Sequence, residues 1–106
     1  MAQFDVHRNP GQNRDSIPFV VIVQSAAFDS YRRRVVAPLV RKSHVGTLHH
    51  ARFNPGFTIK GVAVVLHPLE IVSVPVDKLG KPVASLAAHG SRIIDAIDEL
   101  ISRAYG

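Results

Sequence analysis

The sequence predicts a mainly β domain, a small antiparallel barrel or curled sheet followed by one C-terminal α-helix. Short apolar runs, broken repeatedly by proline and glycine, fill the first three-quarters of the chain, as is typical of all-β folds with close turns. After residue 82 the apolar residues recur with the period of a helix. The 106 residues suffice for one domain and not for two. We therefore expect a single domain over 1–106, with its β portion at about 3–77 and its helix at about 91–104.

Three strands are predicted in the first half of the chain. Residues 4–7 alternate and end at the turn Asn9-Pro10-Gly11, and the polar residues 11–16 form a loop. Residues 18–24 are mostly apolar at both the odd and the even positions, which is typical of a strand covered on both faces. Residues 33–39 form the third strand, which we expect Pro38 to cap.

Further short strands follow, separated by turn residues. Asn54-Pro55-Gly56 predicts a turn, Gly61 a bend, and Pro75 a sheet edge or a strand end. The strand-like segments are residues 48–53 (moderately), 57–60, 62–66 and 71–76.

The C-terminal segment has the pattern of an amphipathic helix. Its apolar stripe consists of Ile93, Ile94, Ile97, Leu100, Ile101 and Ala104. We expect Ser91 as its N-cap and an ion pair between Glu99 and Arg103, four residues apart. Residues 83–88 are expected to form a helical turn that leads into it, with Gly90 as the break.

Composition excludes several classes of function. The chain has no cysteine, which rules out disulfide frameworks, zinc–thiolate sites and cysteine nucleophiles and favours a cytoplasmic protein. The N-terminus lacks the pattern of a signal peptide, and the longest apolar runs, five residues each, are far shorter than a membrane span of about 20 residues. The net charge of +5 favours an acidic partner.

The histidines do not predict a metal site. His44, His49 and His50 lie close in sequence, but their spacing matches no metal-binding rule. On a strand, the last two would point to opposite faces. We therefore expect structural or solvent-exposed histidines and no metal or other cofactor.

No catalytic constellation is recognisable either. Ser25, a histidine and Asp29 make an imaginable nucleophile, base and acid, but the sequence around the serine has no nucleophile-elbow signature. The carboxylates of Asp95, Asp98 and Glu99 are read as a solvated helix face. The residues alone therefore show no recognisable catalytic set, and they stop short of a function.

The strongest charge concentration is Arg32-Arg33-Arg34 with Arg41-Lys42. If residues 33–39 are a strand, Arg32 and Arg34 share a face and can form a phosphate-binding edge. Charges on an edge strand also serve simply to block aggregation. The residues alone leave both interpretations open.

Several segments, in this order, resemble the CcdB family of toxin–antitoxin toxins. The first strand of that family opens like Gln3-Phe4, a later one reads Phe-Val-x-Val-Gln-Ser, and others read Arg-x-Val-x-Pro-Leu and Ser-Val-Pro-Val. The matching segments here are residues 3–4, 19–25 (one residue longer), 33–39, 72–76 and, for the terminal helix, 93–98. The order and spacing of these segments carry the resemblance.

The resemblance implies an SH3-like barrel with a C-terminal helix, acting as a homodimer. It implies a toxin that binds the A subunit of DNA gyrase and traps gyrase on cleaved DNA, and that is itself a poison and not an enzyme. A cognate antitoxin with a CcdA-like disordered tail neutralises such toxins. The toxin–antitoxin complex, and not the toxin alone, binds operator DNA to repress its own operon, and the pair maintains a plasmid or DNA segment.

The resemblance also implies which residues contact gyrase. By position, Ala27 and Phe28 match the contacting loop, and Asp98 matches a contacting helix residue. The family's helix ends in Trp-Gly-Ile, and this chain departs from that ending. An alignment without gaps places Ser102-Arg103-Ala104 on the tripeptide. An alignment that allows three extra residues in this chain places Tyr105-Gly106 on its Trp-Gly.

Two other functions stay open on the sequence. One is an endoribonuclease toxin on the same barrel, for which Arg32 and Arg34 are the first residues to test. The other is a non-toxic CcdB-like binding or regulatory protein, which the altered C-terminus favours.

Overall fold

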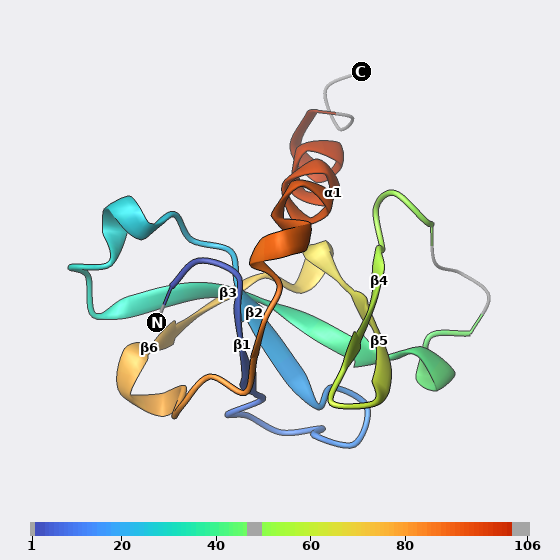
Figure 1. Cartoon of the computed structure of the whole chain (residues 1–106), viewed down its shortest axis with the longest axis horizontal. Helices are drawn as coiled ribbons and strands as arrows, with labels where there is room; N and C mark the ends of the chain where they lie inside the picture. The colour runs from blue at the N-terminus through green and yellow to red at the C-terminus, as the bar shows by residue number, and fades with distance from the viewer. Residues whose placement is uncertain (1, 47–49, 103–106) are drawn as a thin grey trace.

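A computed structural model describes residues 2–46 and 50–102, and it shows a nearly closed, barrel-like antiparallel sheet with one helix across its top (Figure 1). This confirms the predicted mainly β fold with a C-terminal helix. The strands are β1 (Asp5–Arg8), β2 (Phe19–Ile22), β3 (Arg33–Arg41), β4 (Gly56–Ile59), β5 (Val62–Leu66), β6 (Val72–Pro75) and β7 (Ala84–Ser85). The α-helix is α1 (Gly90–Ser102), and the 3-10 turns are η1 (Ala26–Phe28), η2 (Lys42–His44), η3 (Pro68–Glu70), η4 (Val76–Lys78) and η5 (Ala87–His89).

The long strand β3 organises the sheet. The strand order is β4-β5-β3-β2-β1-β7, and β6 also pairs with β3. One edge of β3 pairs with β2, while the other is shared by β5 and β6, between which η3 interrupts the ladder. Pro38 lies inside β3 and does not cap it. The Pro38 carbonyl accepts from the His67 N–H at 3.0 Å. Because the nitrogen and the carbonyl of one residue point to the same edge of a strand, the Pro38 nitrogen faces the gap between β5 and β6, where its missing N–H costs no ladder hydrogen bond.

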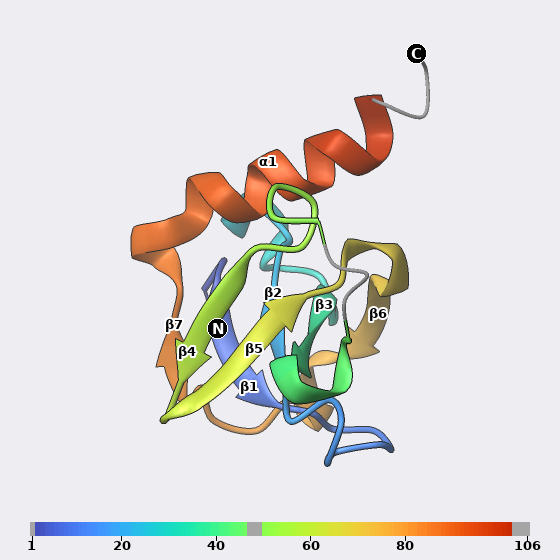
Figure 2. The same cartoon turned by 90° about the vertical axis from the view of Figure 1, so that its right-hand side faces the viewer.

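Two apolar clusters fill the molecule, one on each side of the sheet. The larger lies between the sheet and α1 and includes Val6, Leu39, Leu66, Ile93 and Ala96. Figure 2 shows α1 crossing above the strands, with its C-terminal end reaching past them. The smaller cluster consists of Val20, Ile22, Val36 and Leu79, the residue that follows η4, with Val74 against it. The helix is therefore held to the barrel by its first half.

The junction between the N-terminus and α1 is unusually tight. Phe4 has a φ of +70°, a left-handed conformation that a bulky residue rarely adopts. It persists because the Phe4 N–H donates to the Ile22 carbonyl at 2.7 Å and the Phe4 carbonyl accepts from Leu86 at 2.8 Å. The ring lies against Gly90, where an added Cβ would be 2.5 Å from the Phe4 Cε2. Only glycine leaves room for this ring at the start of the helix.

Several predictions about local structure were wrong. Residues 50–53, within the expected strand 48–53, form a turn, because the Asn54 Oδ1 accepts from the His50 N–H at 2.9 Å and closes it. Residues 47–49 lie outside the described residues.

The predicted bend at Gly61 is confirmed. Lys60 and Gly61, with φ of +51° and +79°, form the two-residue hairpin loop between β4 and β5.

The entry to α1 also differs from the prediction. Ala84 and Ser85 form strand β7 beside β1, so the sheet extends beyond residue 77 and only the end of 83–88 is helical. The turn η5 runs directly into α1, whose first residue is Gly90, and Ser91 is inside the helix instead of capping it. Glu99 lies 3.5 Å from the Arg52 guanidinium, whereas its expected partner Arg103 is outside the described residues.

Candidate functional site: an apolar groove beside the helix

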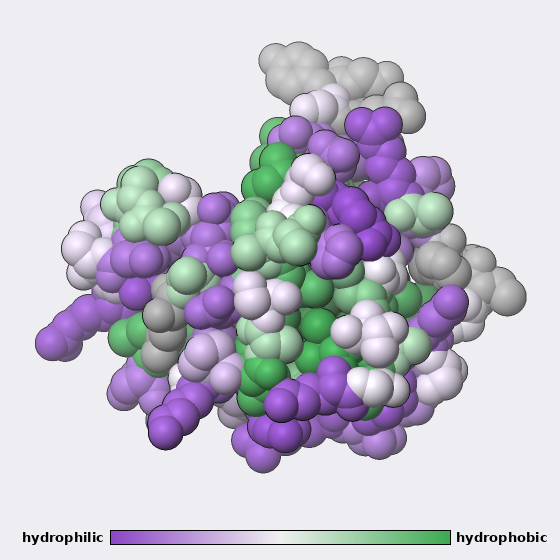
Figure 3. All heavy atoms as spheres, viewed as in Figure 1, coloured by the Kyte–Doolittle hydropathy of each residue, from purple (hydrophilic) through white to green (hydrophobic). Residues whose placement is uncertain are grey.

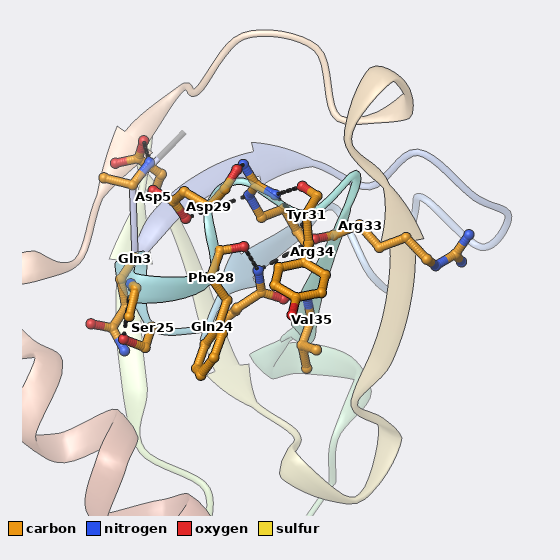
Figure 4. Close-up of polar contacts among 12 residues, drawn as sticks. Gln3, Asp5, Gln24, Ser25, Phe28, Asp29, Tyr31, Arg33, Arg34 and Val35 are labelled. Carbon is orange, nitrogen blue, oxygen red and sulfur yellow. Dashed lines mark hydrogen bonds and ion pairs between the residues drawn. The ribbon is translucent and has the colours of Figure 1, made fainter.

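The loop between β2 and β3, residues 23–32, is held to the barrel by two buried or half-buried polar side chains. The first is Gln24, at the end of β2. Its Nε2 donates to the carbonyls of Phe28 (3.1 Å) and Arg33 (3.3 Å), and its Oε1 accepts from the Val35 N–H at 3.1 Å. A single amide therefore ties the tip of the loop to the strand that follows it (Figure 4).

The second side chain is Arg34, which is buried although it carries a full charge. Its Nη1 donates to the carbonyls of Tyr31 (2.6 Å) and Arg33 (3.0 Å), and its Nη2 donates to the carbonyl of Asp29 (2.9 Å). The Arg34 Nε and the Asp29 Oδ1 lie 3.7 Å apart, an ion pair longer than a hydrogen bond. These bonds satisfy the inward-facing carbonyls of the loop.

Because its backbone is bonded inward, the loop presents its aromatic rings to solvent. Phe28 and Tyr31 are 52% and 66% exposed. Their ring centroids are 6.2 Å apart in an edge-to-face arrangement. The 3-10 turn that carries Phe28 is capped by Ser25, whose Oγ accepts from the Ala27 N–H at 3.2 Å. An exposed aromatic pair on a well-braced loop is typical of a surface that binds another macromolecule.

This loop and α1 enclose an apolar groove of about 540 Å³. In Figure 3 the flank of α1 that faces the loop is hydrophobic, and a hollow separates the two. The described lining contains one charged side chain, that of Arg33, and no acidic one. The groove is lined by Val23, Gln24, Ser25, Phe28, Tyr31, Arg33, Val35, Ile71, Ile94 and Ile97.

The helix contributes a second apolar flank to the groove. Ile93 and Ala96 are buried against the barrel, whereas Ile94 is exposed and Ile97 half-buried. Ile101 follows four residues after Ile97 on the same flank and is 65% exposed. The apolar stripe that the sequence predicts is therefore wider than the barrel covers, and its outer part borders the groove.

The structure places the predicted gyrase contacts in two locations. Phe28 lines the groove, and Ala27 is exposed beside it. Asp98 and Ser102 are exposed on α1 and border a separate hollow that they share with Arg52 and Glu99. The remaining predicted contacts, Arg103, Ala104, Tyr105 and Gly106, lie outside the described residues.

The three consecutive arginines do not form the phosphate edge that the sequence suggested. Arg32 is exposed and precedes β3, while Arg34 is buried and both of its terminal nitrogens bond to carbonyls in or beside the loop. Arg34 is thus a structural residue and is not free to bind phosphate. Sequence reasoning did not identify the groove residues Tyr31 and Ile94. Tyr31 could have been noted from the sequence as a candidate surface residue, because it is a single tyrosine within a polar loop.

The histidines have separate structural surroundings. His7 is fully buried, and its Nδ1 lies 3.1 Å from the Leu79 carbonyl. His44 is exposed, and its Nδ1 is 2.9 Å from the Ser16 Oγ, while His49 is outside the described residues. Across the part of the chain that the structure describes, no three histidine, aspartate or glutamate side chains converge to hold a metal ion. Within residues 2–46 and 50–102, no helix has the length and apolar character needed to cross a bilayer.

Comparison with known protein families identifies the family of this chain. A protein-family model described as CcdB protein matches residues 3–102, nearly the whole chain. No curated protein matches the sequence. The matched region includes the loop with its exposed aromatic pair, the groove and all of the described part of α1.

Proposed function

Because the chain belongs to the CcdB family and is thus the toxin of a toxin–antitoxin pair, we propose that it binds the A subunit of DNA gyrase and traps the enzyme on cleaved DNA. The family match over residues 3–102 carries this proposal. The groove supports it, since a toxin that acts by binding needs an exposed surface with a defined shape. Phe28 lies at that surface with Ala27 beside it, and Asp98 would make a second contact from the separate hollow on α1.

The remaining parts of the proposal concern the partners. The toxin acts in the cytoplasm as a homodimer, without a cofactor and without catalysis of its own. A cognate antitoxin with a disordered tail neutralises it, and the two together bind their operator DNA and maintain the DNA segment that encodes them. The net charge of +5 suits both an acidic tail and approach to a gyrase–DNA complex.

Induced expression of the chain in a gyrase-dependent bacterium tests the proposal. We expect growth arrest with induction of the DNA-damage response, and accumulation of cleaved DNA when the purified protein is added to gyrase. Phe28→Ser removes the ring at the groove and should abolish the arrest. Leu69→Ser is the matched control, because Leu69 is 65% exposed on η3 and does not line the groove.

Three results would contradict the proposal or its choice of contact surface. Unaffected growth together with normal gyrase supercoiling would favour a non-toxic binding or regulatory protein. Arrest accompanied by cleavage of cellular RNA, with supercoiling intact, would identify an endoribonuclease. Equal effects of Phe28→Ser and Leu69→Ser would show that the groove is not the contact surface.

A further inference from the structure

The only charged side chain among the described groove residues is already fixed in position. The Arg33 Nε donates to the Ser73 Oγ at 2.8 Å, and its Nη2 donates to the Ser73 carbonyl at 2.8 Å. The guanidinium therefore reaches from β3 to the neighbouring strand β6. Figure 4 shows this side chain extended away from the rings of Phe28 and Tyr31. Two bonds to a single residue hold a normally flexible side chain in one orientation.

We call the two hydrogen bonds between Arg33 and Ser73 the clasp. Strand geometry explains why the clasp forms at the groove. Arg33 and Val35 are two residues apart on β3, and Ser73 pairs with Val35, so all three side chains share one face. The Val35 N–H and carbonyl both bond toward β2, to the Gln24 Oε1 and the Val23 N–H. In an antiparallel ladder, the backbone groups of its partner Ser73 then point away from β3. The Ser73 carbonyl that accepts from Arg33 therefore lies at the outer edge of the sheet and makes no ladder hydrogen bond to β3.

The clasp leaves the outer end of the guanidinium available. Arginine has five N–H donors, and the bonds to Ser73 use two of them. The other three are the Nη1 pair and one N–H of Nη2, which is the fork that binds a carboxylate with two parallel hydrogen bonds. Arg33 is exposed, and no acidic side chain lines the described part of the groove to occupy this fork.

We propose that Arg33, clasped by Ser73, is the carboxylate anchor of the groove and selects a partner segment in which an aspartate or glutamate lies beside apolar side chains. The apolar side chains would occupy the space between the aromatic loop and α1, and the acid would pair with the free fork. Charge complementarity favours such a segment, because the groove offers one positive anchor and the chain carries +5. Since the clasp already orders the arginine, binding costs less side-chain entropy than at a free arginine. The inference rests on the proposed function and specifies the chemistry of the segment that the toxin recognises.

Two synthetic peptides of 16 residues test the anchor. One has leucine at alternate positions with glutamate and serine between them, and the other replaces each glutamate with glutamine. Fluorescence anisotropy at about 150 mM salt measures the affinity of each peptide for the purified full chain. We expect the glutamate peptide to bind about tenfold more tightly, as a charge-assisted bidentate pair would give.

Three variants separate the anchor from general charge. Arg33→Gln should weaken binding of the glutamate peptide about tenfold and leave the glutamine peptide unchanged. Arg32→Gln removes the same charge from the adjacent residue, whose side chain makes no hydrogen bond within the described residues, and should change the affinity by less than twofold. Ser73→Ala keeps the charge but frees the guanidinium, and should weaken binding about threefold. Perturbation of the Arg33 Nε–H resonance by the glutamate peptide should accompany binding.

Several results would overturn the inference. Equal losses in Arg33→Gln and Arg32→Gln would show that only net charge matters, and failure of the glutamate peptide to bind the wild-type chain would remove the anchor. If Arg33→Gln aggregates but keeps its peptide affinity, the bonds between Arg33 and Ser73 serve to protect the sheet edge from aggregation and not to bind a partner. A dimer that dissociates on Phe28→Ser and excludes both peptides would assign the groove to a second copy. Growth arrest is measured separately, so loss of the anchor and loss of the toxin function give different results.

Discussion

The two halves of α1 have the same composition of isoleucines and charged residues, but they have different surroundings. In the first half, Ile93 is fully buried, and the Arg92 guanidinium lies 4.6 Å from the centroid of the Phe57 ring and donates to the Gly56 carbonyl at 3.0 Å. In the second half, Ile101 is mostly exposed, and Ser102 borders only an open hollow. The first half buries Ile93 and Ala96 against the barrel, whereas the second half leaves Ile101 exposed to solvent.

This contrast shows that one amphipathic stripe can serve two purposes. A helix that only completed a core would expose charged residues and bury its isoleucines. Here the stripe extends around the helix from Ile93, against the barrel, to Ile94 and Ile97, which line the groove. Substitutions in the two halves should therefore separate stability from binding.

The largest expected effect is that of Ile93→Ala. The side chain is fully buried between the sheet and the helix, so its removal leaves a cavity in the larger cluster. We expect the free energy of unfolding to fall by about 3 kcal/mol, within the usual range for such truncations. Urea denaturation followed by circular dichroism measures it. A loss below about 1 kcal/mol would show that the first half of α1 contributes little to the fold.

The mainly β character of the chain and the existence of the C-terminal helix were predictable from periodicity, because burial on one or both faces leaves a regular pattern in the sequence. The entry to the helix was not. Residues 83–88 have no strong β pattern, and β7 forms because the strained Phe4 and its neighbour Val6 offer carbonyls to Leu86 and Val83, a long-range cause. Over residues 50–53 the predicted strand was wrong for a local reason, since the Asn54 side chain closes a turn there.

A second substitution examines the close contact at the start of α1. In Gly90→Ala the new Cβ would lie 2.5 Å from the Phe4 ring, which is too close, so the ring or the helix must shift. We expect a loss of about 2 kcal/mol, as for overpacked cores. The same urea titration measures the effect.

A double-mutant cycle with Phe4→Ala provides the control for Gly90→Ala. If the ring is the obstacle, the alanine at position 90 should cost much less when the ring is absent, and the two effects should be strongly non-additive. Additive effects would mean that a contact other than the Phe4 ring limits position 90, because Gly90 itself has ordinary helical dihedrals.

The candidate site was only partly predictable from the sequence. Resemblance pointed to Phe28, but nothing in the pattern around Arg33-Arg34 indicates that one arginine is buried beneath the loop and the next is clasped to a strand 40 residues away. Those roles depend on which way each side chain points from β3 and on what β6 places beside it. The groove arises from tertiary pairing, which a local pattern does not encode.

The smallest effect on stability, and a large one on function, is expected for Ile101→Ser. The side chain is 65% exposed, and isoleucine and serine have similar helix propensities, so the free energy of unfolding should change by less than about 0.5 kcal/mol. If the outer flank of α1 contacts the target, the growth arrest should nevertheless weaken at least tenfold, measured as the inducer concentration that halves the growth rate. Leu69→Ser, at an equally exposed residue on η3, should leave both quantities unchanged. Full toxicity in Ile101→Ser together with a stability loss above 1 kcal/mol would mean that the second half of α1, like the first, serves mainly the fold.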